Sequence, residues 1–245
     1  MTRPQLEVCI ATYAEAVIAQ DAGADRVELN SALQLGGLTP SPATVQRILA
    51  GCSIEVIAMC RPRPGGFCYN DDHWATLLAD CRWMIEQGVH GIAFGCLTPE
   101  RNIDAARVRQ MRERVGGQQL VFHRAFDLVE DWQSALECLI EAGVDRVMTS
   151  GGAESVPNGL QQIHRIVEFA SGRIEIIPAG GITPENLTEV LRSTGCQQIH
   201  GTFSSSVPDL GYDDAPIRFS PVDQTRAVCP QLLERANAQL RDYFR

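Results

Sequence analysis

The sequence predicts a single α/β domain, a (β/α)8 barrel of the TIM type, over residues 1–245. Short β-rich runs alternate with longer amphipathic stretches along the whole chain, and one phrase recurs before several runs, as in a repeated strand–helix unit. A length of 245 residues also suits one such barrel. A doubly wound sheet is the alternative, and it is disfavoured because no Gly-x-Gly-x-x-Gly follows the first expected strand.

The expected strands are short runs rich in Val, Ile and Leu. They cover residues 6–10, 25–30, 55–60, 91–96, 119–124, 145–150, 174–179 and 197–202. The recurring phrase is Gly-Ala-Asp-Arg-Val at 23–27 and Gly-Val-Asp-Arg-Val at 143–147. Strands that alternate with helices in this way predict a closed parallel barrel.

Amphipathic stretches that predict helices lie between these strands. They cover residues 12–22, 41–50, 71–87, 104–115, 131–142, 158–170 and 184–194. Ser41-Pro42 and Thr183-Pro184 are typical of helix starts. The alternation then stops: we expect a long loop over 205–222 and a last helix within 223–243, where Pro230 either bends the helix or marks its true start.

The formal net charge is −9, and the basic residues form no run. Nucleic acid and anionic membrane are therefore not expected as partners. The N-terminus leads straight into a strand-like stretch without a signal peptide, and no apolar run is long enough to span a bilayer. We expect a cytoplasmic protein whose partner is a small-molecule anion or a metal ion.

Polar residues take the inward parity of several strands, because alternate residues of a strand face opposite sides. Glu7 and Cys9 share the interior side of the first strand, and Glu28 and Asn30 share that of the second. A buried carboxylate needs a partner, and we expect Arg61 to be the electrostatic partner of Glu28. The pattern predicts either an ion-pair network that plugs the barrel or a polar pocket for a small ligand.

Barrel enzymes build their sites at the carboxyl ends of the strands. The candidate catalytic residues there are Glu28, His123 and Asp127. The candidate substrate-binding residues are Glu7, Arg61, Arg63, Arg124, Ser150, Gly180, Gly181 and His200. Glycines before a helix, beside the loop after the last strand, are typical of barrel phosphate sites, although they also serve simple chain reversal. No lysine stands at a strand end, which excludes lysine-based aldolase chemistry.

The chain has nine cysteines and no Cys-x-x-Cys pair. Most are expected to be small core residues, since a free cysteine packs like a small apolar side chain. Cys9, Cys60 and Cys96 could converge from three strands and hold Cu(I), which prefers soft sulfur ligands. Cys60 and Cys96 could equally face the helices.

The runs at 23–29, 36–41, 61–69 and 122–127 resemble the CutC family, as do Thr149-Ser150-Gly151 and Gly180-Gly181-Ile182. The resemblance extends from about residue 6 to 206. It implies a cytoplasmic TIM-like barrel, usually an oligomer, with a role in copper homeostasis and copper binding. Asn30 departs from the family, in which many members carry cysteine at this position, and Thr202 stands where relatives often have serine.

Two functions stay open. In the first, the chain handles copper, with thiols and His123 or His200 as ligands. In the second, it is an enzyme for a small anionic, sugar-phosphate-like substrate, with arginines holding the anion and Glu28 or His123 transferring protons. From the resemblance we also expect a homodimer, to which the sequence adds Trp74, Trp83 and Trp132 on helical stretches.

Overall fold

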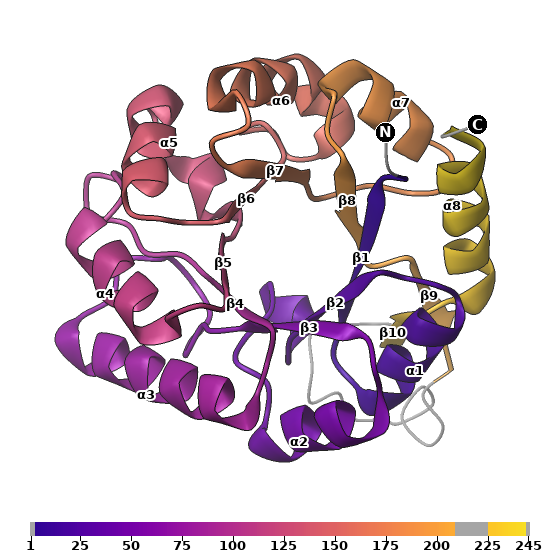
Figure 1. The fold of residues 1–245 in the computed structure, drawn as a ribbon, viewed down its shortest axis with the longest axis horizontal. Coiled ribbons are helices and arrows are strands. Elements are labelled where there is room, and N and C mark those ends of the chain that lie inside the picture. Colours follow the sequence, from indigo (N-terminus) through magenta and orange to yellow (C-terminus); the bar gives the residue numbers. More distant parts are fainter. Residues whose placement is uncertain (1–2, 209–224, 244–245) are drawn as a thin grey trace, which may run out of the picture.

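The computed structural model describes residues 3–208 and 225–243 and contains a barrel of parallel strands ringed by helices (Figure 1). Its strands are β1 (Gln5–Ile10), β2 (Arg26–Leu29), β3 (Glu55–Met59), β4 (Gly91–Phe94), β5 (Gln119–Phe122), β6 (Arg146–Thr149), β7 (Glu175–Pro178) and β8 (Gln198–Gly201). They pair in the order β7-β6-β5-β4-β3-β2-β1-β8. An isolated parallel bridge between Ala179 and His200 joins β7 to β8. The predicted barrel is confirmed, and the doubly wound alternative is wrong.

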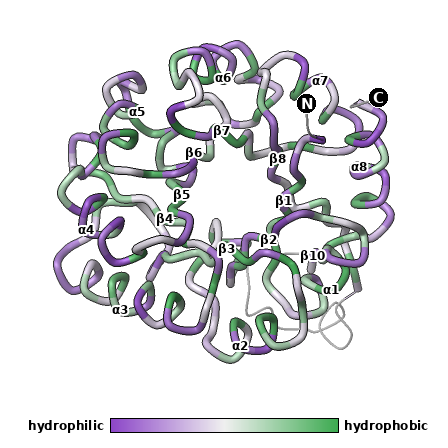
Figure 2. The backbone as a smooth tube through the Cα atoms, in the orientation of Figure 1, coloured by the Kyte–Doolittle hydropathy of each residue, from purple (hydrophilic) through white to green (hydrophobic). Residues whose placement is uncertain are grey.

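The helices lie outside the strands and turn their apolar residues inward (Figure 2). They are α1 (Tyr13–Asp21), α2 (Pro42–Gly51), α3 (Asp71–Gln87), α4 (Ala105–Val115), α5 (Trp132–Glu141), α6 (Val156–Ala170), α7 (Leu187–Thr194) and α8 (Pro230–Tyr243), with short 3-10 turns η1 (Leu33–Leu35) and η2 (Arg124–Leu128). Thr183-Pro184 does not start α7. Asn186 is the residue before the helix, and its Oδ1 accepts from the Thr183 N–H, so the proline belongs to the preceding turn.

The segment after β8 differs from the expectation. Ser204–Val207 forms strand β9, which pairs antiparallel with β10 (Thr225–Val228). The last helix therefore begins at Pro230 and not at 223, since a proline is tolerated in the first turn, where its missing N–H has no helical partner. The rest of the expected loop, residues 209–224, lies outside the described residues.

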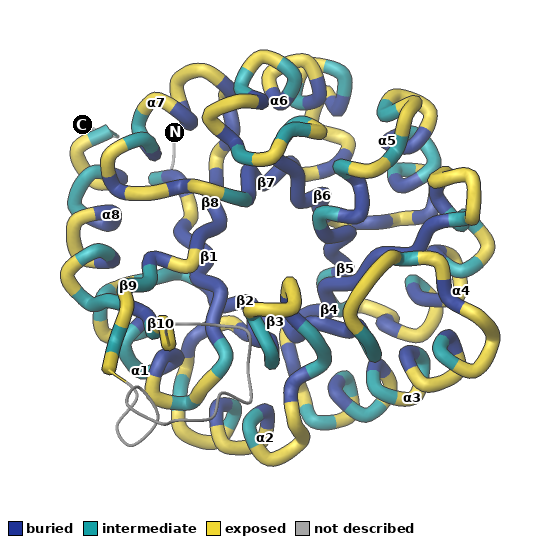
Figure 3. Tube along the Cα trace, turned by 180° about the vertical axis from the view of Figure 1, so that it is seen from behind, coloured by how far each residue is buried: buried dark blue, intermediate teal, exposed yellow. Residues whose placement is uncertain are grey.

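The barrel interior has an apolar and a polar side, and both are buried (Figure 3). Strands β3 to β7 contribute small apolar clusters, which consist of Ile57, Met59, Ala93 and Val121, and of Met148, Ile177 and Ala179. Strands β8, β1 and β2 contribute buried polar residues at the same depth, which are His200, Glu7, Cys9, Glu28 and Asn30. The fold thus gathers the buried acids of the interior, His200 and Cys9 on three adjacent strands.

The two copies of the Asp-Arg-Val sequence form equivalent contacts at the amino end of the barrel. Asp25 Oδ2 accepts the Leu6 N–H at 2.8 Å, and Asp145 Oδ2 accepts the Leu120 N–H at 2.7 Å. The arginine that follows each aspartate points inward and is buried. Arg26 pairs with Glu7 and donates to Gln198, while Arg146 pairs with Glu175 and donates to Gln119. The ion-pair network allowed by the sequence therefore exists, at the end opposite the expected site.

The three tryptophans pack against the core. Trp74 is buried, and Trp83 and Trp132 are partly buried against the same apolar cluster. They therefore give no separate support for a subunit interface. No helix among the described residues is long and apolar enough to cross a membrane.

Candidate functional site

Strand register places the polar residues of the interior next to one another. Glu7 of β1 lies opposite His200 of β8 in the ladder. Cys9, two residues further along β1, lies opposite Glu28 of β2. Because alternate residues point to the same face, all four side chains enter the barrel together. The inward orientation that parity predicted for Glu7, Cys9 and Glu28 agrees with this arrangement.

His200 lies between two carboxylates. Its Nδ1 is 2.7 Å from Glu7 Oε1, and its Nε2 is 3.9 Å from Glu28 Oε2. Burial opposes a charge on Glu7, but Arg26 and His200 outweigh it and lower the pKa of Glu7. Since this carboxylate is ionised, the ring donates to it through Nδ1–H. The Nε2 atom is thereby turned toward Glu28.

Burial and mutual charge shift the other pKa values of this group. Burial raises the pKa of Glu28, and the charge of Glu7 adds to the effect while His200 opposes it. Burial alone lowers the pKa of His200, but Glu28 and Glu7 outweigh it and raise that pKa. Burial, followed by the charge of Glu28, raises the pKa of the Cys9 thiol well above its usual value. The Cys9 thiol therefore keeps its proton near pH 7, and a bound cation would have to replace it.

Asn30 completes this group from the end of β2. Its Nδ2 donates to Glu28 Oε2 at 2.8 Å and approaches Cys9 Sγ at 3.4 Å. Glu28 Oε1 and Asn30 Oδ1 are buried without a hydrogen-bond partner among the described residues. Such atoms are costly to bury unless a ligand or a water satisfies them.

Cys9, Glu28 and His200 form a potential metal site, because one ligand atom from each lies within 4.8 Å of the others. The structure does not bring Cys60 and Cys96 to this place. Both belong to the apolar layer between strands and helices. The Cys60 thiol approaches the Leu77 carbonyl of α3, and the Cys96 thiol approaches the Asp104 carbonyl before α4.

Arg61 and Arg63 contact backbone carbonyls. Arg61 is buried, and its Nη1 donates to the carbonyls of residues 35, 36 and 37 while its Nη2 donates to that of Gly65. Arg63 donates to the carbonyls of Pro64, Gly66 and Cys68. No carboxylate among the described residues forms an ion pair with Arg61 or Arg63. The expected contact between Arg61 and Glu28 does not form, and both arginines hold loops.

His123 lies beside these loops. Its Nδ1 accepts from the Ala125 N–H at 3.1 Å, and its Nε2 has no hydrogen-bond partner among the described residues. The Phe67 ring packs against both His123 and Arg61. Burial, together with the charge of Arg61, lowers the pKa of His123 to about 3. The ring is therefore neutral near pH 7, with an unused Nε2–H donor.

Asp127 organises the turn after β6. Its carboxylate accepts from Thr149 Oγ1, from the N–H groups of Ser150 and Gly152, and from Arg124 Nε. Ser150 Oγ in turn contacts Arg124 Nη2 at 2.7 Å. With its oxygens occupied in this way, Asp127 is suited to positioning Arg124 and not to transferring protons.

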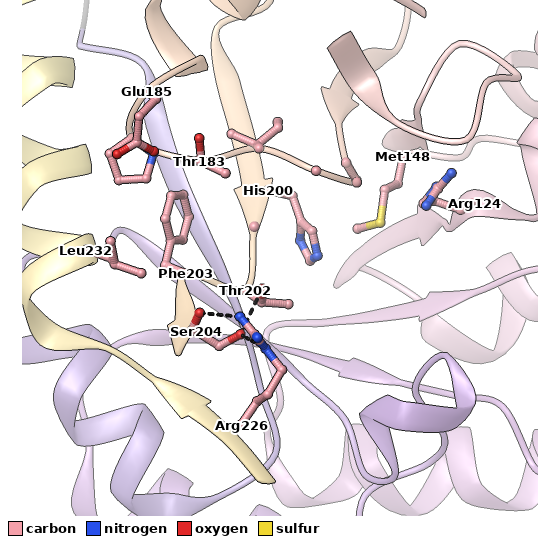
Figure 4. A pocket seen from close by; sticks show the side chains of 16 residues that line it. Arg124, Met148, Thr183, Glu185, His200, Thr202, Phe203, Ser204, Arg226 and Leu232 are labelled. Carbon is pink, nitrogen blue, oxygen red and sulfur yellow. Dashed lines mark hydrogen bonds between the residues drawn. The ribbon is translucent and has the colours of Figure 1, made fainter. Parts of the chain in front are cut away.

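A cavity of about 370 Å³ lies at the carboxyl ends of β7 and β8 (Figure 4). Four of the expected substrate-binding residues line it, namely Arg124, Gly180, Gly181 and His200. His200 joins it to the group around Cys9 and Glu28, because the same ring belongs to both.

Sequence reasoning missed two arginines. Arg26 fixes Glu7, and it has the same parity as Glu28 two residues later, so parity could have found it. Arg226 lines the cavity from β10. The sequence does not indicate a role for Arg226, because the regular alternation of strands and helices stops before this residue.

The chain matches the model of the CutC family over residues 4–205. A family protein CutC of Treponema denticola is 42% identical over 200 residues, which are 82% of this chain and 81% of that protein. A human relative named copper homeostasis protein cutC homolog is 40% identical over 195 residues, 80% of this chain and 71% of the human one.

A crystal structure of CutC from Streptococcus agalactiae superimposes with a TM-score of 0.77 at 32% identity, and the match covers 81% of this chain and 98% of that one. Sequence and structure thus agree over the whole barrel, and the chain belongs to the CutC family.

Proposed function

We propose that the chain binds a divalent metal ion of intermediate softness, such as Zn²⁺, through Cys9, Glu28 and His200. The observation that carries this proposal is the placement of one ligand atom from each residue within 4.8 Å of the others. All three residues are buried. Thiolate, imidazole and carboxylate are the ligands that Zn²⁺ takes in proteins, at about 2.0–2.3 Å, so a small contraction of the group would close it around one ion.

The contacts of His200 support a ligand role. Metal-binding histidines commonly donate their other ring N–H to a carboxylate, which fixes the tautomer and the ring orientation. Here the Nδ1–H donates to Glu7, and Arg26 holds Glu7 in turn. The 3.9 Å between His200 Nε2 and Glu28 Oε2 is too long for a hydrogen bond. It is a reasonable separation for two ligands of one ion.

Cu(I) does not fit this group well. Cu(I) prefers several thiolate or thioether ligands, and the potential site has one thiol, Cys9. The side chain next to that thiol is the amide of Asn30. A relative is named for copper homeostasis, and for this chain we propose a weaker affinity for Cu(I) than a dedicated copper carrier needs.

Competition of the metal-free chain with a chromophoric chelator tests the proposal. Zn²⁺ should bind at one site per chain, and Cys9→Ser or His200→Gln should weaken binding about tenfold or more, as loss of one ligand predicts. Cys60→Ser is the matched control, because its thiol is also buried but faces α3. Equal Zn²⁺ affinity in all variants would contradict the site. Tight one-to-one retention of Cu(I) against a strong Cu(I) chelator, lost in Cys9→Ser, would overturn the preference for a divalent ion.

The cavity favours a second candidate function, an enzyme for a small anionic substrate. His200 faces that cavity and the metal-binding group at once, and a metal ion at the base of a cavity can polarise a substrate oxygen.

All nine cysteines are free thiols, which suits the reducing cytoplasm that we propose as the location of the protein.

A further inference from the structure

The cavity at the carboxyl ends of β7 and β8 contains cationic groups that metal binding does not use. Its volume of about 370 Å³ lies in the range of small-molecule pockets, about 300–1,000 Å³. Arg124 of η2 and Arg226 of β10 reach it from different elements, with His200 between them in this view (Figure 4). We propose that the cavity binds the phosphate group of a small phosphate monoester, with Arg124 as its direct contact and Arg226 as a second positive charge on the cavity wall.

The guanidinium of Arg124 is held in place with one edge free. Its Nε donates to Asp127 Oδ2 at 2.8 Å, and its Nη2 donates to Ser150 Oγ at 2.7 Å. Its Nη1 has no hydrogen-bond partner among the described residues. A donor that is already oriented loses little conformational entropy when it binds an anion.

The loop after β7 leaves room for an anion beside Arg124. Gly180 has φ 112° and Gly181 has φ 75°, both in the left-handed region that favours glycine. A Cβ atom on Gly180 would lie 2.8 Å from Arg124 Nη1, and one on Gly181 would lie 3.0 Å from Ser155. Because Gly180 has no side chain, Arg124 Nη1 lies close to the loop backbone, and an anion bound at this guanidinium would lie beside the loop.

Arg226 supplies a second positive charge. Its Nε and Nη2 donate to the hydroxyl and the carbonyl of Ser204. Within the described ranges no carboxylate forms an ion pair with it. Among the described residues the acid that lines the cavity is Glu185, which already pairs with Arg235 at 2.7 Å. Two guanidinium groups match the charge and the several acceptor oxygens of a phosphate monoester better than those of a monocarboxylate.

The organic part of the monoester then faces His200, which lines the same cavity. This orientation toward a bound metal ion rests on the proposed function, whereas the phosphate contacts do not. The two proposals can therefore fail separately.

Calorimetric titration of the full chain with inorganic phosphate, with and without Zn²⁺, tests the phosphate site. Binding should saturate at one site per chain and weaken as salt rises. Arg124→Gln should reduce the affinity about tenfold, the loss expected for one charge-assisted contact, and Arg226→Gln should reduce it by a smaller factor that shrinks as salt rises. Arg82→Gln is the matched control, since that arginine is exposed on α3 and pairs with Glu86. Arg226→Gln alters an exposed position of the hairpin, so it gives an answer even if Arg124→Gln fails to fold.

The outcomes separate the two sites. Cys9→Ser should lose Zn²⁺ and keep its phosphate affinity, while Arg226→Gln should keep Zn²⁺ and bind phosphate more weakly. Absence of saturable phosphate binding to the wild type would overturn the inference. It would also be overturned if both arginine variants bound phosphate like the wild type, or if malonate saturated the cavity and phosphate did not.

Discussion

At the scale of single residues, we expect Asn30 to determine whether the proposed metal site favours Cu(I) or a divalent ion. Its amide nitrogen lies 3.4 Å from Cys9 Sγ, so a cysteine at this position would bring a second thiol next to the first. Two adjacent thiolates are the ligands that Cu(I) prefers.

Asn30→Cys should therefore raise the affinity for Cu(I), by about tenfold or more if one thiolate contact is gained. The Zn²⁺ affinity should change much less, because the ligands from Glu28 and His200 are retained. Competition with a Cu(I)-selective chelator under reducing conditions measures the effect. Asn102→Cys, at an exposed position, is the control for an added thiol. An unchanged Cu(I) affinity in Asn30→Cys would show that Asn30 does not set this preference.

His123 should make the folded protein sensitive to acid. Its pKa falls from 6.5 to about 3 on folding, through burial and the charge of Arg61. Above pH 6.5 both states hold a neutral ring, and between 6.5 and 3 the unfolded state alone takes up the proton, so this contribution to stability falls as the pH falls. His123→Asn keeps an acceptor for the Ala125 N–H and does not titrate.

Urea unfolding of both proteins between pH 7 and pH 4 measures the effect. The free energy of unfolding of the wild type, minus that of His123→Asn, should fall by about 1.4 kcal/mol per pH unit below pH 6. A difference that stays constant over this range would mean that His123 titrates normally in the folded chain.

Parity predicted which residues face the interior, and it could not predict which of them would meet. Arg61 was expected near Glu28, but Arg61 lies at the level of the loops and donates to carbonyls. The cation that enters the acidic group is Arg26, which lies opposite Glu7 in the strand ladder. The alternation of residues along a strand shows which side chains face the interior. It does not show the register between neighbouring strands, and that register decides which side chains contact one another.

At the scale of elements, Arg61 joins the loop after β2 to the loop after β3. It donates to the carbonyls of residues 35, 36, 37 and 65, and its side chain packs on Phe67. Hydrogen bonds from a charged donor contribute more than neutral ones. The side chain thus contributes to the shape of the barrel mouth.

Arg61→Met should destabilise the protein by about 2 kcal/mol or more, because several charge-assisted hydrogen bonds are lost. Amide exchange should accelerate first in residues 33–37 and 63–67. Thermal melts and hydrogen exchange measure both, and added phosphate should raise the melting temperatures of the variant and the wild type alike, so that the difference between them remains. If Arg61 binds a ligand instead, the variant melts close to the wild type without phosphate and lacks the shift that phosphate gives the wild type.

Element boundaries followed from the sequence where capping residues mark them. The expected helix 71–87 coincides with α3, which Asn70 caps and Gly88 ends with φ 93°. Strand β10 could not be expected in the same way, since Thr225–Val228 gains its partner from a distant segment, Ser204–Val207. Tertiary pairing of this kind leaves little local pattern.

At the scale of the whole molecule, the interior polar group lies on three adjacent strands, β8, β1 and β2. The opposite wall contributes the apolar clusters, with Arg146 at its amino end. Ligand binding should therefore leave the fold of β3 to β6 largely unchanged and should stabilise the part of the ring where β8 meets its neighbours.

Self-association stays a prediction from the family resemblance, because the tryptophans pack inward. We expect a dimer mass in light scattering at micromolar concentration. A monomer mass over that whole range would contradict it.

His200 of β8 lies opposite Glu7 of β1, so the interior polar group can form only after both strands have been synthesised. The ribosome makes the first strand early and the eighth strand only after nearly two hundred further residues have been added. Until then Glu7, Cys9 and Glu28 have no imidazole beside them, and the proposed metal ion would lack one of its three ligands. If the proposed site is correct, we expect a truncated chain that lacks β8 to bind no ion there, even where its other strands fold.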